Sequence, residues 1–476
     1  MKIYNKSIFI FRRDYRLEDN IGLLEALNKS IHVIPIFIFT PEQLIKNKYK
    51  SDNCVQFMIE SLDDLDEYLR KKGSRMFYFF GKPHEVVNKL IKKLDVDAIF
   101  VNRDYTPYSK DRDMKIQKVC DKNKIKFESF EDVLLQPVET IRSGSGEIYS
   151  KFTPFYNVAK KVKVLEVKKN NYSNYYSNKN KISGEFKGDK HKFYIHNANI
   201  AIHGGRDNAL KILANVQKFK KYNTERDMLA KETTRLSAYI KFGCVSIREV
   251  YHKIKDKLGI KNDLIKQLYW REFYYNITEF HPNTLSTNWK EKNFKDNYKK
   301  VPWITYESAN TKERDYWKAW CDGKTGYPIV DAAMRELNMS GFMHNRGRLI
   351  VASFLVKNLF FNPNEGEKYF ANHLVDFDPI VNGSGSGNWA WVAGNGVDTQ
   401  PFFRVFSPIL QSQHYDSECE YIKKWIPELK DVDNKHIHEW NKYYELYPDI
   451  KYPEPIVDYS STAKKAIEKY KKALYK

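Results

Sequence analysis

Residues 323–354 read GKTGYPIVDAAMRELNMSGFMHNRGRLIVASF. Gly326 and the two residues after it form a turn signal, and Pro328 stands where a helix can begin, because the first helical residue needs no backbone N–H. Gly341 interrupts the pattern that follows. The segment therefore predicts a helix from about Pro328 to Gly341 and a second helix after it.

Polar and basic groups stand at the start of that second helix. They are His344, Asn345, Arg346 and Arg348, and the apolar run from Leu349 to Leu355 follows them directly. Charges at the mouth of a buried helix are costly unless another group pairs with them. This arrangement indicates a buried cofactor.

The chain is long and basic. Its 476 residues exceed one ordinary core, so we expect two domains. Lysine plus arginine number 80 against 60 for aspartate plus glutamate, and the resulting net charge of +20 favours polyanions such as nucleic acid. No run approaches the ~20 apolar residues that span a bilayer, and the start MKIYNKSIFIFRRD lacks a signal-peptide layout. We expect no membrane association, no secretion, and a cytoplasmic or nuclear location.

The cysteines indicate a reducing compartment rather than a metal site. Their number is odd and their positions are scattered, without the spacing of metal ligands. They are Cys54, Cys120, Cys244, Cys321 and Cys419. We expect no metal.

Short apolar runs alternate with amphipathic segments up to about Phe130. The runs SIFIF, IHVIPIFIF, MFYFF and DAIFV are typical of buried strands. Between them, apolar residues from Val55 to Leu69 recur at helical spacing, and Gly73 is placed to end that helix. This pattern predicts an α/β domain with a doubly wound parallel sheet over residues 1–130.

The rest of the chain divides in two. A tract rich in Lys, Asn and Ser, VKKNNYSNYYSNKNKISGEFKGDKHK, cannot bury much apolar surface, so residues 131–200 are interpreted as a connector. From about Asp207 the periodicity is helical. Residues 201–476 are therefore predicted to form an all-α domain.

Hydroxyl groups cluster at one predicted helix start, in the segment Thr233–Ser237, with Tyr222 and Arg226 upstream. Unpaired backbone N–H groups and the helix dipole favour a phosphate at such a place. An ordinary helix cap would use the same residue types. Both interpretations stay open on the residues alone.

Acidic groups follow the apolar helix that Arg348 begins. A carboxylate from Asp376 or Asp378 paired with Arg348 would compensate both charges and fix the two segments around whatever lies between them. A structural ion pair would need no further function.

An aromatic wall is expected on the helix that contains QLYWREFYYN, residues 267–276. Trp270 and Tyr274 are four residues apart and share one face, beside Arg271. Aromatic platforms of this kind stack on bases that leave the DNA helix, although core packing would also use them.

Several motifs together resemble the DNA photolyase and cryptochrome family. Besides residues 323–354 and 267–276, they are FRRDYRLEDN (11–20), TTRLSAYIKFG (233–243), DFDP (376–379), NWAW (388–391) and QPFFRVFSP (400–408). The resemblance extends over nearly the whole chain. It implies an N-terminal antenna domain, an α-helical FAD domain, UV-damaged DNA as the partner, and a monomeric light-driven lyase that splits cyclobutane pyrimidine dimers with reduced FAD.

The resemblance also implies the cofactor contacts. FAD would be held by Tyr222, Thr233, Thr234, Arg235, Leu236, Ser237, Gln267, Arg271, Asn345, Arg348, Asp376, Asp378 and Asn382. Asn382 would face flavin N5, where plant cryptochromes carry Asp. The loop NGSGSGNW is about three residues longer than the family's usual form, so Asn388 is the rival for that position.

The DNA contacts implied by the resemblance surround the same helices. They are Arg226, Gln267, Trp270, Tyr274, Asn345, Arg346, Trp391, Arg404 and Gln411. Trp270 and Trp391 would clamp the flipped dimer.

The choice of lesion depends on MHNR, residues 343–346. Photolyases that repair (6-4) photoproducts use paired histidines here, whereas this chain has His344 followed by Asn345. Repair of a cyclobutane dimer needs no acid–base catalyst, so we expect the cyclobutane dimer to be the substrate. Gln267 resembles the (6-4) branch and keeps that alternative open, as does a cryptochrome-like photoreceptor without repair activity.

The tryptophans that would carry electrons to the flavin depart from the family's pattern. Trp389 matches the tryptophan nearest the flavin and Trp303 the surface one, but Pro363 stands at the middle position, so Phe360, Trp317, Trp320 or a tyrosine would have to substitute.

An antenna chromophore, either folate or deazaflavin, would lie near the loop after the fourth strand. That loop contains Asn102, Asp104, Tyr105 and Tyr108.

Overall fold

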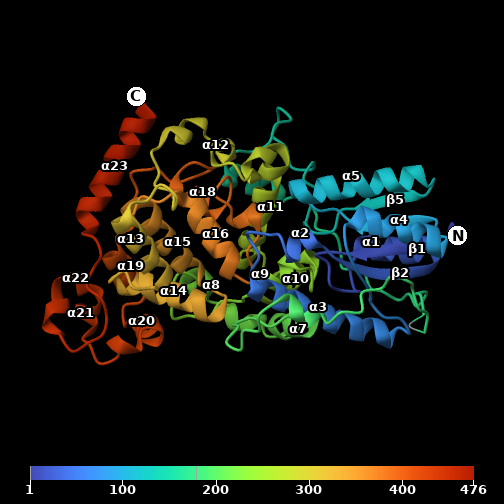
Figure 1. Cartoon of the computed structure of the whole chain (residues 1–476), viewed down its shortest axis with the longest axis horizontal. Coiled ribbons are helices and arrows are strands. Elements are labelled where there is room, and N and C mark those ends of the chain that lie inside the picture. Colours follow the sequence, from blue (N-terminus) through green and yellow to red (C-terminus); the bar gives the residue numbers. More distant parts are fainter. Residues whose placement is uncertain (1, 178, 476) are drawn as a thin grey trace.

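The computed structural model describes residues 2–177 and 179–475. Figure 1 shows the α/β part at one end of the molecule and the helical part at the other. Within the described residues, one sheet has five parallel strands in the order β3-β2-β1-β4-β5. The strands are β1 (Tyr4–Phe11), β2 (Ser30–Phe39), β3 (Phe77–Phe80), β4 (Ala98–Asn102) and β5 (Lys126–Phe130).

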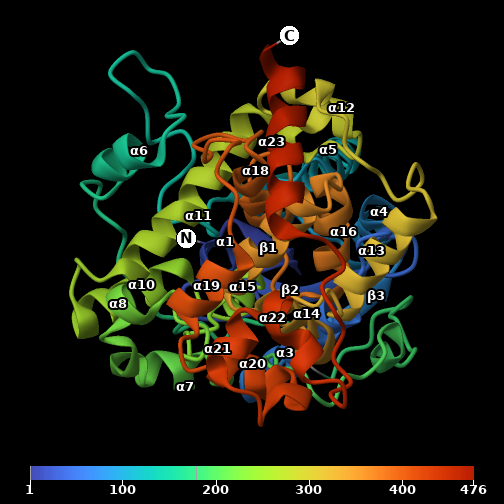
Figure 2. The same ribbon diagram turned by 90° about the vertical axis from the view of Figure 1, so that its left-hand side faces the viewer.

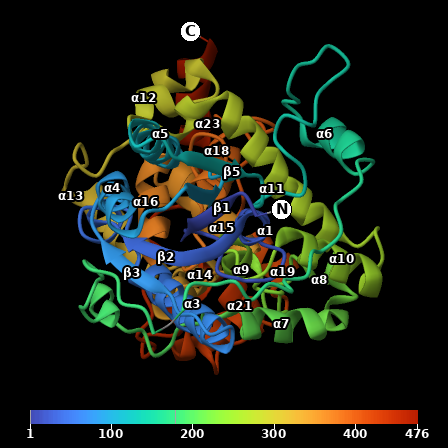
Figure 3. The ribbon, with the colours of Figure 1, turned by 90° about the vertical axis from the view of Figure 1, so that its right-hand side faces the viewer.

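Helices cover both faces of this sheet, as Figure 3 shows from the sheet's end of the molecule. They are α1 (Ile21–Lys29), α2 (Pro41–Leu44), α3 (Asp52–Lys71), α4 (Pro83–Leu94) and α5 (Pro107–Lys122). Successive side chains of a strand point to opposite faces, so Ile8 and Ile10 pack with α4 and α5 while Phe9 and Phe11 pack with α1 and α3. The predicted doubly wound α/β domain is confirmed.

The sequence predicted four of these strands and missed β5. Its sequence KFESF is half-buried at best, because β5 is an edge strand and contributes little apolar surface. Gly73 has φ +74° directly after α3, as its place in the sequence predicted.

The segment 131–200 lies against both domains and buries more apolar surface than its composition predicted. Phe152 and Phe155 are buried in α6 (Phe152–Ala159). Farther on, Tyr176 donates a backbone hydrogen bond to Val33 of β2 over 2.8 Å, and Tyr175 and Ile182 are buried. Because polar residues surround these few apolar side chains, the composition of the segment did not reveal that they are buried.

The remaining chain is helical, which confirms the predicted class of the second domain (Figure 1). Its helices are α7 (Arg206–Ala214), α8 (Tyr222–Glu225), α9 (Ser237–Lys241), α10 (Ile247–Leu258), α11 (Asp263–Phe280), α12 (Trp289–Lys292), α13 (Thr311–Asp322), α14 (Pro328–Ser340), α15 (Asn345–Ser353), α16 (Pro363–His373), α17 (Pro379–Asn382), α18 (Asn388–Ala393), α19 (Pro408–Tyr415), α20 (Glu420–Trp425), α21 (Asn434–His438), α22 (Trp440–Tyr443) and α23 (Tyr459–Tyr475). Short turns of tighter or wider helix are η1 (Lys190–Phe193), η2 (Val216–Phe219), η3 (Pro282–Leu285), η4 (Asp296–Lys300), η5 (Phe354–Asn358), η6 (Pro427–Leu429) and η7 (Tyr444–Leu446). Pro328 begins α14, and Gly341 ends it with φ +66°.

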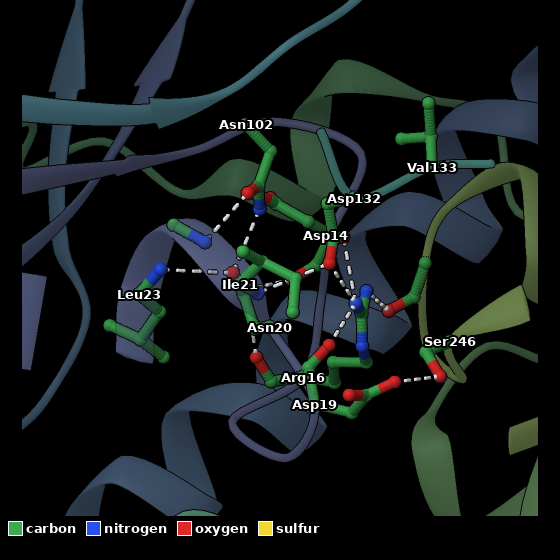
Figure 4. Close-up of polar contacts among 12 residues, drawn as sticks. Asp14, Arg16, Asp19, Asn20, Ile21, Leu23, Asn102, Asp132, Val133 and Ser246 are labelled. Atoms are coloured by element: carbon green, nitrogen blue, oxygen red, sulfur yellow. Dashed lines mark hydrogen bonds and ion pairs between the residues drawn. The ribbon is translucent and has the colours of Figure 1, made fainter. Parts of the chain in front are cut away.

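A buried charge network joins the two domains (Figure 4). Arg16, in the loop after β1, donates to both carboxylate oxygens of Asp132 over 2.7 Å. Ser246 and Arg248, at the start of α10, donate to Asp19 over 2.5 and 2.8 Å. Because all four charged side chains are almost fully buried, the network fixes the helical domain against the loop at the carboxyl ends of the strands. No helix among the described residues is long and apolar enough to cross a membrane.

Candidate functional site

Three segments meet at a charged group in the centre of the helical domain. Arg348 of α15 donates to Asp376 Oδ2 over 3.0 Å, and Ser237 of α9 donates to the same oxygen over 2.6 Å. Burial alone would favour the neutral carboxyl, but Arg348 and these hydrogen bonds hold the pKa of Asp376 below its usual value. The predicted ion pair is therefore present, and Asp376 is ionised.

A narrow cavity lies beside this ion pair. Its lining residues are Arg348, Leu349, Ala352, Phe370, Asn382, Asn388, Trp389 and Val392. Asn382 Oδ1 accepts a hydrogen bond from the Asp378 backbone N–H over 2.8 Å, which orients its amide nitrogen away from that contact. Both asparagines that the sequence offered as rivals thus face one cavity, together with Trp389.

Asp378 binds across the domain boundary. Tyr275 donates to Asp378 Oδ2 over 2.9 Å, and Arg13 lies 3.3 Å from the same oxygen. Arg13 also donates to Tyr275 over 2.6 Å. The sequence did not single out Arg13 or Tyr275, although both lie inside motifs that it quoted, because their contacts join positions more than 100 residues apart.

The segment Thr233–Ser237 leads into α9. Arg235 has φ +52°, and its guanidinium lies over Phe342, as does that of Arg348. Ser237 is the first residue of α9 and spends its hydroxyl on Asp376, so it is not the helix cap. Tyr222 and Arg226 lie at α8, where Arg226 is 3.4 Å from Asp263.

An aromatic wall forms on α11, as predicted, and a partner that the sequence did not predict lies against it. Trp270 and Tyr274 stack with ring centroids 5.8 Å apart. Phe152 of α6 stacks on Trp270 at 3.6 Å, with the planes within 5°. Because Asp398 accepts the Phe152 backbone N–H over 2.9 Å, the loop that follows α18 fixes the ring behind Trp270.

The neighbouring polar residues have mixed environments. Arg271 donates to the Val133 carbonyl oxygen over 2.6 Å. Arg346 pairs with Asp227 over 2.9 Å and lies over the ring of Tyr415. Gln267, Gln411 and Trp391 are half-buried, and Asn345 and Arg404 are exposed.

The tryptophans separate into two groups. Trp389 contacts Trp320 with centroids 6.5 Å apart, Trp320 contacts Trp317 at 5.5 Å, and Trp317 contacts the exposed Tyr306 at 6.1 Å. Trp303 instead lies among Trp289, Phe360 and Tyr470. Among the described residues, no ring contact joins the Trp303 group to Trp389.

Most side chains of the loop after β4 contact other residues of the fold rather than an open surface. Asn102 donates to Asp14 over 2.6 Å and to Asn20 over 2.8 Å inside the network of Figure 4, and Tyr105 is buried and donates to Glu131. Tyr108 lies beside Arg112.

Only Asp104 of the four predicted loop residues lines the open cleft of about 590 Å³ there. Its other lining residues are Arg103, Lys110, Asp113, Met114, Gln117, Phe127, Ser129, Glu131 and Glu279. Among the residues that the structure describes, no group of three His, Cys, Asp or Glu side chains is arranged to hold a metal ion.

Comparison with known proteins identifies the family of this chain. The DNA photolyase family model matches residues 7–171, and that for the FAD binding domain of DNA photolyase matches residues 264–472. The chain belongs to the DNA photolyase family. Deoxyribodipyrimidine photo-lyase of Buchnera aphidicola is 34% identical over 99% of this chain and 98% of its own length, and that of Escherichia coli is 32% identical over 97% and 98%.

Solved structures of the family have the same fold. An archaeal photolyase from Sulfolobus tokodaii with two FAD molecules is 40% identical, covers 98% of this chain and 100% of its own, and has a TM-score of 0.85. A class III photolyase from Agrobacterium tumefaciens, 29% identical over 99% and 98%, has a TM-score of 0.88, and a cryptochrome from Synechocystis, 26% identical over 98% and 100%, has 0.86. The TM-scores of the two photolyases and the cryptochrome lie within 0.03 of one another, so repair enzymes and a cryptochrome share this fold.

Proposed function

We propose that this photolyase splits cyclobutane pyrimidine dimers in DNA, with light as the energy source and FAD as the cofactor. The observation that carries this proposal is the Arg348–Asp376 pair and its asparagine-lined cavity beside an aromatic wall, in a chain that matches named deoxyribodipyrimidine photo-lyases over its whole length. When bound, reduced FAD supplies the electron that opens the cyclobutane ring. The protein supplies position and electrostatics.

The residues at the cavity fit such a cofactor. Asp376 Oδ1 is buried and has no hydrogen-bond partner among the described residues, and a buried acceptor of this kind calls for a donor. We assign Arg348, Asp376 and Asn382 to the flavin, because Arg348 and Asn382 line one cavity and Asp376 is paired with Arg348. Asn388 shares that cavity and is the alternative to Asn382. The other proposed contacts are Asp378, Asn345, Gln267, Arg271 and, toward the phosphates, Tyr222 and Thr233–Ser237.

The DNA contacts are proposed on the face that Figure 2 turns toward the viewer, where α8, α11 and α19 lie. Trp270 and Trp391 are half-buried and would stack on the extruded dimer. Arg226, Arg346, Arg404, Asn345, Tyr274, Gln267 and Gln411 are the further proposed contacts, and the protein acts as a monomer. Phe403 and Leu410 are 60% and 52% exposed near Arg404, which suits partners with unstacked bases.

The environment of His344 supports the cyclobutane dimer over the (6-4) product. Its side chain is buried, and Nδ1 accepts the Arg346 backbone N–H as the cap of α15. Burial lowers the pKa of His344 to about 4, so the imidazole is neutral at physiological pH and is a poor proton donor. The (6-4) chemistry, which needs such a donor, is the second candidate because of Gln267.

Flavin reduction is proposed to use Trp389, Trp320 and Trp317, with Tyr306 at the surface, in place of a route through Trp303. An electron that leaves Trp389 is replaced from Trp320 and then from Trp317. Tyr306 would lose its phenolic proton to water on oxidation and regain an electron and a proton from an external thiol. The unbroken ring contacts to an exposed tyrosine support this route over Pro363.

The open cleft beside Asp104 is proposed as the place of an antenna chromophore, with residues 1–130 as the antenna domain, 131–200 as the connector and 201–476 as the catalytic domain. Folate and deazaflavin are both planar heteroaromatic compounds with polar edges, and the cleft offers them mixed charges and two apolar side chains, Met114 and Phe127.

The deciding experiment illuminates the photoreduced protein with oligonucleotides that carry either a cyclobutane dimer or a (6-4) product, followed by chromatography. We expect loss of the cyclobutane dimer in light and no change in darkness. Repair of the (6-4) product alone would transfer the proposal to that lesion. If neither lesion changes while the flavin photoreduces normally, the photoreceptor alternative replaces repair.

A further inference from the structure

The C-terminal helix α23 presents unneutralised positive charge beside the proposed lesion site. Its 17 residues contain five lysines, Lys464, Lys465, Lys469, Lys471 and Lys472, and one acidic residue, Glu468. All five lysines are exposed, and none has an ion-pair partner among the residues that the structure describes. Other helices of the chain pair their lysines internally, such as Lys115 with Asp111 in α5. The charge on α23 is therefore available to an anion.

A buried hydrogen bond fixes α23 to the helix that carries Trp391. Tyr470 is fully buried and donates from its hydroxyl to the Ala393 carbonyl oxygen over 3.0 Å, at the end of α18. Lys357 donates to the Phe402 carbonyl oxygen over 3.0 Å and lies over the Tyr470 ring. The position of α23 is thus set by the same residues that hold α18 and the loop before Arg404, and Figure 2 shows α23 beside α18.

One flank of α23 is turned toward that loop. Phe402 packs on both Tyr470 and Tyr475, with centroids 5.6 and 6.0 Å apart. At 100° per residue, Lys471 lies between these two tyrosines around the helix, and Lys464 lies seven residues earlier on the same flank. Lys465 and Lys472 lie on the other flank, toward Lys469, whose ammonium group is over Phe360.

We propose that the Lys464–Lys471 flank of α23 binds phosphates of the DNA duplex next to the lesion. The proposal rests on the proposed function, because it places the lesion between Trp270 and Trp391. A helix of 17 residues is about 25 Å long, which corresponds to about seven base pairs at about 3.4 Å each. The helix therefore extends the binding surface along one arm of the duplex, and exposed Arg404 closely follows Phe402, on which Tyr470 and Tyr475 of this helix pack.

The test compares two double variants with equal charge. Lys464→Gln with Lys471→Gln removes the proposed flank, and Lys465→Gln with Lys472→Gln removes two charges from the other flank of the same helix. Each is titrated with dimer-containing duplexes extended by about three or about nine base pairs on one side of the lesion, at several salt concentrations. Thermal denaturation checks that all variants remain folded.

The first variant is expected to weaken binding of the long duplex about tenfold and to reduce the slope of log Kd against log salt by about 1 to 2, because about 0.9 is lost per phosphate contact. The effect should appear for an extension on one side only, and the short duplex and the second variant should change little. Equal effects of the two variants, or no dependence on duplex length, would overturn the proposal.

A second experiment distinguishes failure of the α23 proposal from failure of the proposed repair function. It measures repair of a short single-stranded oligonucleotide that carries a dimer, by the unsubstituted protein. If that repair occurs and the flank effect is missing, only the role of α23 is wrong. If the oligonucleotide is not repaired, the proposed function itself fails.

Discussion

Asp376 binds both Arg348 and Ser237 in the interior of the helical domain. We expect its charge to affect both the stability of the protein and the binding of flavin. Replacing it, Asp376→Asn, leaves the Arg348 guanidinium without an ionised partner. Removing one member of a buried ion pair costs about 3 kcal/mol or more, and we expect that loss in urea unfolding of the flavin-free protein. The purified variant should also contain little flavin, measured by absorbance per protein.

Asp431→Asn is the control for this substitution. Asp431 is exposed and its contact with Lys430 is long, at 3.9 Å, so the loss should stay below about 1 kcal/mol. Full flavin content in Asp376→Asn would show that this carboxylate does not hold the cofactor.

Trp320 gives a second test at a single side chain. Trp320→Phe interrupts the contacts from Trp389 to Trp317, so light-driven reduction of the bound flavin should fall to a small fraction of the parent rate. Trp303→Phe should leave that rate nearly unchanged. The rates are measured by flavin bleaching with a thiol donor, and radical spectroscopy shows whether a tyrosyl signal disappears. Dimer repair after chemical reduction should be unaffected in both variants, and a larger effect of Trp303→Phe would refute the proposed route.

Sequence reasoning found the charged residues of the site better than their partners. Arg348 stood out because it begins an apolar run, and a carboxylate partner followed from the cost of burying its charge. The contact of Ser237 with Asp376 was not predicted, since a hydroxyl at a helix start looks the same whether it caps the helix or binds a distant carboxylate. Phe152 could not be found, because nothing in its own segment marks a partner 118 positions away at Trp270.

Helix α11 is joined to the segment after β5 through Glu272. Its Oε2 accepts the backbone N–H groups of Leu135 and Gln136 over 3.0 and 3.3 Å. The side chain is buried, and burial outweighs Arg271 and these hydrogen bonds, which raises the pKa of Glu272 from 4.5 to about 7. The folded protein therefore favours the protonated carboxyl, whose stabilising contribution is present below about pH 4.5 and is lost as pH rises to about 7.

Glu272→Gln keeps an oxygen acceptor for both N–H groups and cannot ionise. We expect the variant to gain stability relative to the parent as pH rises from about 4 to about 8, by about 3 kcal/mol at most, from about 1.4 kcal/mol per pKa unit. The measurement is the free energy of unfolding in urea at several pH values. Glu468→Gln, in the exposed face of α23, should show no such trend, and a flat difference for Glu272→Gln would contradict the pKa shift.

Elements were predicted well where both faces of a strand or one face of a helix are apolar, as in β1, β2 and α14. β5 was missed because an edge strand needs little apolar surface. The connector was judged by composition, yet the backbone hydrogen bonds of Val33 with Asn174 and Tyr176 need no special side chains.

The division into two domains followed from the change of periodicity near residue 200, but the way they are joined did not. Arg16, Asp19, Asp132 and Arg248 come from three separate segments, and their pairing appears only in the folded chain. Asp132 accepts from both arginines, and although burial opposes its charge, Arg16 and Arg248 lower its pKa. Its stabilising contribution is thus present above about pH 4 and is lost on acidification.

Asp132→Asn leaves two buried guanidinium groups with Asp19 as their one carboxylate in this network. The loss of stability should be about 3–5 kcal/mol. It should weaken the contact between the domains, because the network lies between the loop after β1, the connector and α10. We therefore expect calorimetry of the variant to resolve two unfolding transitions where the parent shows one. Asp431→Asn serves again as the control. If Asp132→Asn instead lowers a single transition without splitting it, the network stabilises one cooperative unit, and the two domains do not fold as separable parts.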